Sequence, residues 1–331
     1  MSRFTKFGNA LYTGERSFDF VGNRLRWYVI GGSLVVLAVA FTLLRGGFTF
    51  GIEFSGGSEF RVSNPPAVVE QTAIDTVQLE AGVESNPRVS IVGGDSIRVQ
   101  TEQLTDAHTT LLRQDLADAY DVPLDKVTAS FIGATWGQDI TRQALIGLGV
   151  FLVLVSIVMA LYFRTWKMSL AALTALAHDL LITAGIYGVL GYEITPAAVI
   201  GFLTILGYSL YDTVVVFDKV RENTNQDGEE SSRTFAESVN LAVNQTLVRS
   251  INTSVVAVLP VGSILFIGSV LLGAGTLRDI ALALFIGMLA GTYSSIFIAA
   301  PMYVHLRENE PENLKQGRKA REPRPTSGAV R

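Results

Sequence analysis

Three ionisable residues lie inside long apolar stretches of the sequence, where a charge is costly. Asp212 lies in GYSLYDTVVVFDKVREN, Asp179 in AHDLLIT and Arg249 in NQTLVRSINTS. A charge near the centre of a membrane-spanning helix costs at least about 2.5–3.5 kcal/mol on insertion scales, and such residues commonly mark ion or proton pathways. We therefore take these residues as candidates for reversible proton binding.

Helical spacing predicts that Asp212 and Arg249 each lie on a polar helix face. Residues three to four positions apart share a face, and the supporting polar residues here are Tyr208, Gln245, Asn252 and Thr253. An arginine beside an aspartate favours the ionised carboxylate, and separation of the two favours proton uptake. We expect Asp212 and Arg249 to form the proton-coupling pair. The alternative is a static buried ion pair that only fixes helix packing.

Asp179 lies in the middle of another apolar run, next to His178. A carboxyl group there could take part in proton coupling, with His178 as a relay. The alternative is a hydrogen bond to a hydroxyl or amide on a neighbouring helix, which would be a structural role. The sequence leaves both interpretations open.

The elements that carry these residues are six apolar runs, each near the roughly 20 residues that a helix needs to cross a bilayer. They cover residues 27–44, 144–163, 168–190, 194–217, 247–272 and 277–304. Lys and Arg gather before the first run and after the last, an excess that is typical of cytoplasmic segments. We therefore expect an α-helical integral membrane protein with six transmembrane helices and both termini in the cytoplasm.

The segments around the runs follow from this topology. Residues 1–26 are a cytoplasmic N-terminal segment, and 27–44 are transmembrane helix 1. Residues 144–304 hold transmembrane helices 2–6 with a cytoplasmic loop at 218–246, and 305–331, rich in charge and proline, form a disordered cytoplasmic tail. In the sixth run Gly287, Gly291 and Ser295 recur every four residues, a pattern typical of close helix packing.

Residues 45–143 differ from the rest, because short alternating runs and turn residues replace the continuous apolar runs. The pattern predicts strands at 58–63, 88–92, 97–101 and 126–132, with helices at 67–80 and 105–120. The resulting order, β-α-β-β-α-β, is that of α+β ferredoxin-like domains. We expect this segment to be an extracytoplasmic domain that binds or couples rather than catalyses.

Nothing in the sequence predicts an enzyme. The chain has no cysteine, and His108 in the α+β segment has no partner at metal-ligand or triad spacing. We therefore expect no metal and no cofactor, with protons as the coupling ion.

Several segments together resemble the SecD/SecF family of bacterial protein-export membrane proteins. Besides the stretches quoted above, they are GIEFSGG at 51–57, FIGATWG at 131–137 and GTYSSIFIA at 291–299. Their joint order along the chain is more specific than any one of them. The motif glycines outside the membrane are Gly51, Gly56 and Gly57.

The resemblance implies an RND-type half with six spans that pairs with SecD in the accessory complex SecDF. It implies that the proton motive force drives late steps of preprotein export through the SecYEG channel, with YajC-type and YidC-type subunits as further partners. The translocating preprotein and the lipid bilayer are partners too, and no nucleic acid is expected. The family's proton-coupling role would fall on Asp212 and Arg249.

The sequence departs from the family pattern at Glu53, Ser55, Ala134 and Lys219, where Asp, Thr, Pro and Arg are usual. The first three lie in or next to the α+β segment, so any residue-level expectation for that face is weaker. The rival interpretation is an RND-type exporter subunit for a small molecule or lipid.

Overall fold

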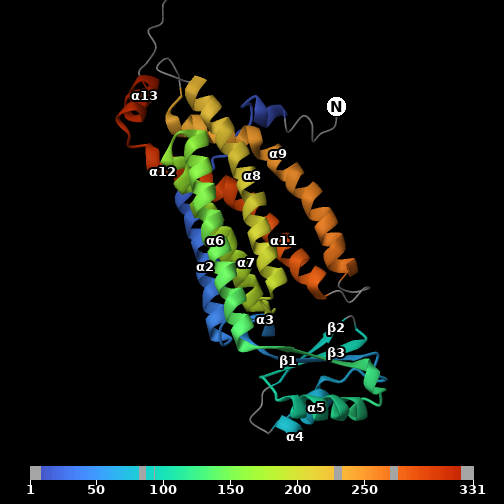
Figure 1. Cartoon of the computed structure of the whole chain (residues 1–331). Coiled ribbons are helices and arrows are strands. Elements are labelled where there is room, and N and C mark those ends of the chain that lie inside the picture. Colours follow the sequence, from blue (N-terminus) through green and yellow to red (C-terminus); the bar gives the residue numbers. More distant parts are fainter. Residues whose placement is uncertain (1–8, 82–86, 93, 227–232, 269–274, 322–331) are drawn as a thin grey trace, which may run out of the picture.

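A computed structural model describes residues 9–81, 87–92, 94–226, 233–268 and 275–321. It consists of a bundle of long helices with a small α/β unit at one end (Figure 1). Within the described residues, six helical stretches are long and apolar enough to cross a membrane, as the sequence predicts. Their helices are α2 (Arg24–Leu44), α6 (Ala134–Phe163), α7 (Trp166–Leu190), α8 (Pro196–Gln226), α9 (Phe235–Ser263) and α11 (Gly275–Ser294).

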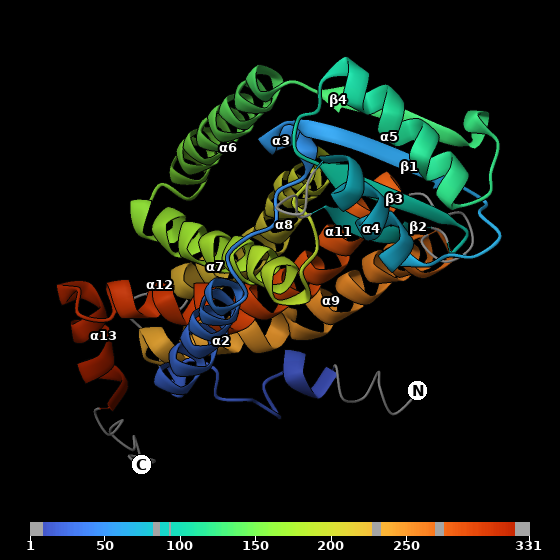
Figure 2. The same ribbon diagram turned by 90° about the horizontal axis from the view of Figure 1, so that it is seen from below.

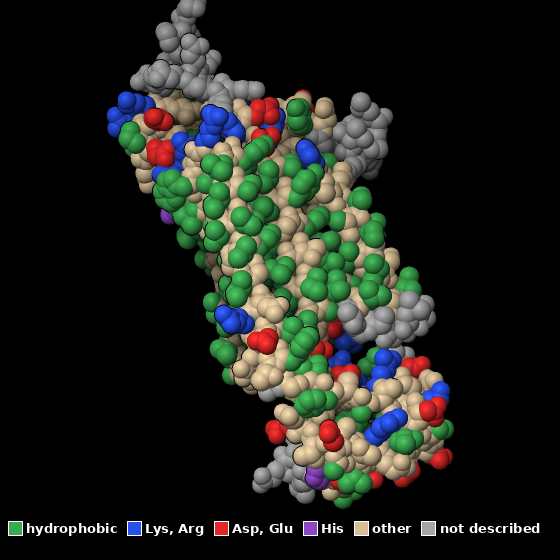
Figure 3. Space-filling view, in the orientation of Figure 1, with side chains coloured by type: hydrophobic (Ala, Val, Ile, Leu, Met, Phe, Trp, Pro, Cys, Tyr) green, Lys and Arg blue, Asp and Glu red, His purple; other side chains and the backbone are tan. Residues whose placement is uncertain are grey.

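Two of these helices continue through π-helical turns. α9 runs into η2 (Ile264–Gly268), and α11 runs through η3 (Ser295–Ala299) into α12 (Ala300–Arg307). π-Helical turns inside longer helices are frequent at functional sites. On the face that Figure 3 shows, hydrophobic side chains form a broad band over the bundle, and charged side chains gather at its two ends. This is the surface expected of a multi-pass membrane protein.

The helices extend past the apolar runs and into the expected cytoplasmic connection at 218–246. α8 continues to Gln226, and α9 already begins at Phe235. Polar and charged residues mark the point where a helix leaves the lipid. They do not end the helix, since Lys, Arg and Glu are good helix formers. α9 also has a capping box, in which Thr234 and Glu237 bind each other's backbone N–H groups.

Part of the tail that the sequence predicts to be disordered is helical, because α13 covers Pro311–Arg321. The prediction of disorder is wrong for these residues. The residue before it, Glu310, accepts a hydrogen bond of 2.8 Å from Lys167 at the start of α7. On α13 itself, Gln316 donates to the backbone carbonyl of Arg233. These contacts hold the helix against the bundle, whereas residues 322–331 of the expected tail lie outside the described part.

The α/β unit has the element order β-α-β-β-α-β. Its elements are β1 (Gly57–Ser63), α4 (Glu70–Ala81), β2 (Arg88–Val92), β3 (Ser96–Thr101), α5 (Asp106–Ala119) and β4 (Val127–Ile132). A short helix, α3 (Ile52–Ser55), precedes β1, and a 3₁₀ turn, η1 (Leu124–Lys126), precedes β4. The sheet order is β2-β3-β1-β4, and every pairing is antiparallel.

Alternation along the strands gives this sheet two different faces. Phe60, Val62 and Val99 point into a core that α4 and α5 complete with Val77 and Leu116. The other face lies toward the helical bundle, as Figures 1 and 2 show. Polar residues on that face therefore lie next to the ends of the spanning helices that are nearest the sheet.

The α/β unit contacts the turn between α7 and α8. Arg98 of β3 forms ion pairs with Glu59 of β1 and with Glu193 of that turn. The backbone joins as well, because the N–H of Ile194 donates to Thr49 at 2.7 Å and that of Gly51 to Ile194 at 3.0 Å. The sheet unit is thus fixed to the bundle by both side chains and backbone.

Candidate functional site

Helix α8 lies among α7, α9 and α11 and carries Asp212 into their shared interior. Asp212 is 5% exposed and Asp179 of α7 is fully buried. Both carboxyl groups are therefore inside the protein and do not face lipid. The sequence analysis expects Arg249 beside Asp212, and the structure differs at this point.

Hydroxyl groups from two other helices bind Asp179. Ser209 of α8 donates to Oδ2 at 2.5 Å, and Ser294 of α11 donates to the same atom at 2.8 Å. Nδ1 of His178 lies 3.3 Å from Oδ1. Asp179 thus joins three helices through hydrogen bonds to hydroxyls, as one of the two interpretations of the sequence predicts.

Asp212 is bound to α9 through Ser250 and not through Arg249. The Ser250 hydroxyl donates to Oδ1 at 2.8 Å. Among the described residues, Oδ2 of Asp212 has no hydrogen-bond partner. No ion pair joins Asp212 to Arg249 in the part of the chain that the structure describes, and Arg249 is exposed. The predicted direct pair is therefore wrong for this conformation.

The reason lies in the rotation of α9 about its axis. One residue along a helix turns the side chain by about 100°, so Ser250 and Arg249 cannot share a direction. The face that meets α8 is that of Ser250 and Ser254, both buried. Arg249 instead lines a cavity of about 450 Å³ with the acidic residues Asp218 and Glu222.

The supporting residues named from the sequence separate into two groups. The Tyr208 hydroxyl donates to Ser254 at 3.5 Å, so it belongs to the α8–α9 contact. Gln245 accepts a hydrogen bond from Asn223 at 3.0 Å and lines the cavity with Arg249. Asn252 is exposed and Thr253 is half-buried, so the structure does not bring these two to Asp212.

The seam between α8 and α11 runs past both acidic residues. Gly287 and Gly291 are tightly packed, because a Cβ on Gly287 would lie 2.2 Å from a methyl carbon of Ile205. A Cβ on Gly291 would lie 2.9 Å from Cβ of Ser209. One turn further, Ser295 shares a 3.0 Å hydrogen bond with Thr213, the neighbour of Asp212. The expected close-packing pattern is therefore present.

Sequence reasoning missed the serines that bind the carboxyl groups: Ser209, Ser250 and Ser294. Their signal was a hydroxyl inside an apolar run within one or two turns of other polar residues. The four-residue pattern of Gly291 and Ser295 indicates close packing and draws no attention to Ser294, which stands between them. A lone serine is so common in spanning helices that spacing does not single it out.

A third buried acid, Asp279, was also missed. It lies at the outer end of α11, where Thr195 donates to its carboxylate at 3.0 Å and Tyr187 to its backbone carbonyl at 2.6 Å. Arg278 forms an ion pair with it at 3.4 Å. The signal was an adjacent pair of opposite charges at the edge of the sixth apolar run.

The motif glycines lie where the chain leaves α2 for the sheet, and two of them, Gly56 and Gly57, are needed there for backbone conformation. Gly56 and Gly57 have φ values of 75° and 148°, a region that L side chains rarely adopt. A Cβ on Gly57 would also lie 2.5 Å from the carbonyl oxygen of Thr101. Gly51 precedes α3, and a Cβ there would lie 2.3 Å from the carboxylate of Glu53.

The described residues contain no group of three or more potential metal ligands.

Comparison with known proteins gives the family of this chain. The profile described as "Protein export membrane protein SecD/SecF, C-terminal" matches residues 113–309. A Protein translocase subunit SecF from Streptomyces coelicolor is 46% identical over 94% of this chain and 83% of its own length. One from Mycobacterium leprae is 43% identical over 93% of this chain and 68% of its own.

A solved structure agrees with these matches. The crystal structure of SecDF, a translocon-associated membrane protein from Thermus thermophilus, superposes with a TM-score of 0.75 at 31% identity. The match covers 88% of this chain but 39% of that one, so this chain spans about two fifths of the longer protein. The sequence motifs, the membrane bundle and these matches agree: the chain belongs to the SecD/SecF family of protein-export membrane proteins.

Proposed function

We propose that this chain is an accessory subunit of the Sec preprotein translocase that uses the proton motive force to promote late steps of protein export. The observation that carries the proposal is the pair of buried carboxyl groups, Asp179 and Asp212, held by hydroxyls on either side of one helix seam. Family membership supplies the export role, because its named relatives are translocase subunits rather than enzymes.

Hydroxyl partners suit a site that gains and loses a proton. A serine hydroxyl donates to a carboxylate and can also accept from a carboxylic acid. Asp179 can therefore change its protonation state without leaving a buried polar group unpaired. At Asp212, Oδ2 has no partner among the described residues, so it is the atom on which we place the proton.

Protonation of either acid changes the hydrogen bonds at the seam. Ser209 binds Asp179 and packs against Gly291 of α11. Asp212 lies three residues further along α8, next to Thr213, which binds Ser295. A change at one of these carboxyl groups is thus adjacent to the contacts that fix α8 against α11, and small residues there permit a shift.

The energy source is sufficient for such a movement. One charge that crosses 100 mV releases about 2.3 kcal/mol. A few protons in each cycle therefore supply the free energy needed to repack a helix seam. In this proposal Arg249 faces Asp212 only in another conformation, in which α9 has turned.

The α/β unit is the element that acts on the exported chain. Its β-α-β-β-α-β order and antiparallel sheet support a ferredoxin-like domain, which we place outside the cytoplasmic membrane, with both termini in the cytoplasm. Since this chain covers 39% of the SecDF structure, we infer that SecD supplies the rest of the unit. The SecYEG channel and the translocating preprotein are the further partners, with YajC-type and YidC-type subunits beside them.

The test is an export assay in vesicles that contain the chain with its SecD and SecYEG partners under an imposed proton gradient. Asp212→Asn and Asp179→Asn keep the shape of the side chain and remove its titration. We expect each variant to assemble normally and to lose the proton-dependent stimulation of export. Asp218→Asn is the matched control, because Asp218 is an exposed acid on the same helix.

Two results would contradict the proposal. Undiminished stimulation in both aspartate variants would remove the buried acids from the mechanism. An equal loss in Asp218→Asn would show that the assay reports general charge at this end of the bundle.

A further inference from the structure

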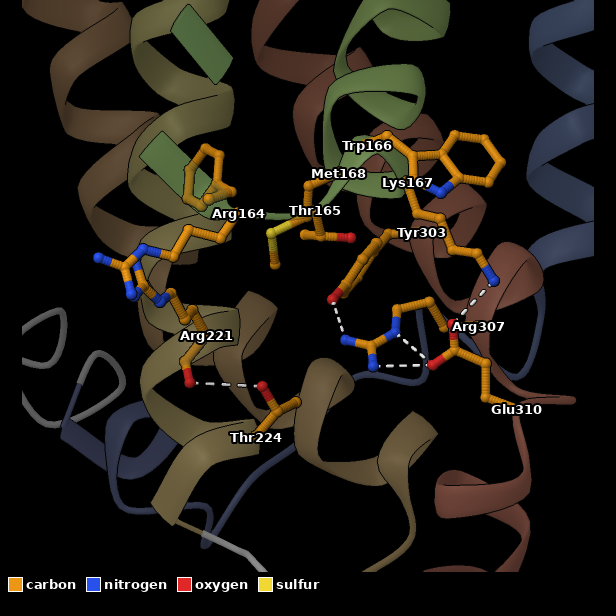
Figure 4. Close-up of a pocket in the computed structure, with 11 residues that line it drawn as sticks. Arg164, Thr165, Trp166, Lys167, Met168, Arg221, Thr224, Tyr303, Arg307 and Glu310 are labelled. Atoms are coloured by element: carbon orange, nitrogen blue, oxygen red, sulfur yellow. Dashed lines mark hydrogen bonds and ion pairs between the residues drawn. The ribbon is translucent and has the colours of Figure 1, made fainter. Parts of the chain in front are cut away.

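A basic cavity lies at the end of the bundle opposite the α/β unit. It has a volume of about 320 Å³ and lies between the α6–α7 turn, the end of α8 and the end of α12. Arg164, Lys167, Arg221 and Arg307 line it, and so does the acid Glu310. Figure 4 shows these side chains around the hollow, with Arg164 and Arg221 on one side and the Lys167–Glu310–Arg307 group on the other.

Glu310 is already neutralised by two of the four cations. Its carboxylate accepts hydrogen bonds from Lys167 and Arg307 at 2.8 Å each. Burial alone would raise the pKa of Glu310, but these hydrogen bonds and the two positive charges hold it below the ordinary value. Glu310 is therefore ionised at neutral pH and is not free to pair with the other arginines.

Arg164 and Arg221 have no acidic partner in the part of the chain that the structure describes. Arg164 caps α6 in the left-handed conformation and is exposed. Arg221 donates to the backbone carbonyl of Tyr162 at 3.2 Å and forms no ion pair there. Two guanidinium groups line one cavity without an acidic partner among the described residues, and most of their fork-shaped donors remain available.

An apolar groove between the same helices lies deeper in the bundle. It has a volume of about 480 Å³ and is lined by Ile157 of α6, Leu173 and Ala177 of α7, and Leu206 of α8. Ile157 is six residues from Phe163 and Leu173 is five from Met168, both of which line the basic cavity, so the separation along the helices is about 8–9 Å. Figure 2 shows α6 at the outside of the bundle, so lipid can reach the groove.

The aromatic residues beside the cavity place it at the level of the lipid headgroups. Trp166 is 63% exposed and Tyr162 is 51% exposed at the ends of α7 and α6. Exposed Trp and Tyr concentrate at membrane interfaces. The charged cavity and the apolar groove thus lie at the depths of a phosphate group and an acyl chain.

We propose that this cavity binds one anionic phospholipid, with its phosphate on Arg164 and Arg221 and one acyl chain in the groove between α6 and α7. Basic pockets between spanning helices are known places for acidic headgroups. A bound lipid would hold α6, which is largely exposed, against α7 and α8. The proposal is independent of proton coupling, because its residues are separate from Asp179 and Asp212.

The experiment counts bound lipids on the purified full-length chain by native mass spectrometry. The probes are phosphatidylglycerol and phosphatidylcholine of the same acyl length. The double variant Arg164→Gln with Arg221→Gln should weaken phosphatidylglycerol binding by about fivefold for each removed charge, roughly 25-fold in total. Phosphatidylcholine should show no such difference.

The matched control is Arg26→Gln with Arg318→Gln, which removes two exposed charges near the same end of the bundle outside the cavity. An equal loss in this control would overturn a specific site. A second variant, Ala177→Trp, fills the groove and should also weaken phosphatidylglycerol binding. Circular dichroism confirms that each variant is folded.

Glycerol phosphate, which has the phosphate without the acyl chains, separates a lipid from a free anion. We expect it not to displace phosphatidylglycerol at equal concentration. Full displacement, or unchanged lipid binding in Ala177→Trp, would overturn the proposal.

Discussion

Asp179 accepts hydrogen bonds from Ser209 and Ser294, and Asp212 accepts one from Ser250. These hydroxyl donors carry no charge, and the other group at Asp179 is the imidazole of His178, whose Nδ1 lies 3.3 Å from Oδ1. A cation partner would tie each carboxylate to one protonation state, because a charged pair in a low-dielectric site is costly to break. At the scale of single residues, the hydroxyl partners are compatible with the reversible proton binding that the proposed function requires.

Glu53 allows a pH prediction outside the membrane. Burial raises the pKa of Glu53 above its ordinary value, and the positive charge of Arg98 offsets this only in part. The folded protein therefore binds the proton more tightly than the unfolded chain does. The protonated Glu53 side chain therefore favours the folded state. Its contribution to the free energy of unfolding is fully present below the ordinary Glu pKa of about 4.3, and it is lost as the pH rises through the raised pKa of Glu53 in the folded protein.

We expect Glu53→Gln, which resembles the protonated side chain, to raise the thermal unfolding midpoint at pH 7. The difference in unfolding midpoint between the variant and the native chain should disappear at about pH 4 and below, where Glu53 is protonated in both the folded and the unfolded state. Glu102→Gln, at an exposed position of the same unit, is the control and should show no such trend. A gain that is constant over the pH range would contradict the assignment.

At the scale of elements, the contact between α8 and α11 depends on the absence of side chains. A Cβ on Gly287 would come within 2.2 Å of Ile205. Close approach of two backbones favours van der Waals packing, the main force that joins helices within lipid.

Gly287→Val should therefore lower stability by about 1–3 kcal/mol through overpacking, and should also reduce proton-dependent export. Gly147→Val on α6 is the control, because a Cβ there meets nothing within 4 Å. Thermal unfolding in detergent measures the first effect and the vesicle assay the second. An unchanged unfolding midpoint in Gly287→Val would show that the two helices separate easily at this point.

The elements were predictable because hydropathy and alternation report burial directly. The strand 88–92 was placed at its observed bounds, and the second helix of the α/β unit was expected to begin at Thr105, which caps α5. The end of α8 at Gln226 was not predictable in this way, since hydropathy marks where lipid ends and not where a helix ends. The rotation of α9, which decides between Ser250 and Arg249, depends on packing with other helices and leaves no mark in one sequence.

At the scale of the whole molecule, the α/β unit and the bundle meet through the turn between α7 and α8. Arg98 on the bundle-facing side of the sheet binds Glu193 of that turn. Two backbone hydrogen bonds at Ile194 add to this contact. The unit therefore has a defined orientation on the bundle and cannot turn freely about its linkers.

Glu193→Gln should loosen this contact and widen the range of positions that the unit occupies. The chain has no cysteine, so spin labels on Ser130→Cys and Leu190→Cys report one distance between sheet and bundle without background labelling. We expect a broader distance distribution in the variant. Arg61 is an exposed residue of β1 that lies opposite Arg98 in the strand register. Arg61→Gln should leave the distance distribution unchanged. An equally narrow distribution in Glu193→Gln would mean that the backbone bonds suffice.

Three consecutive residues of that turn each hold a different part of the molecule. Glu193 holds the sheet, Ile194 holds the segment before α3, and Thr195 holds Asp279 of α11. Three consecutive residues leave almost no length of chain that could stretch between these contacts. The sheet, the segment before α3 and the end of α11 are therefore tied together within three residues, so a displacement of any one of them must strain its contacts with the other two.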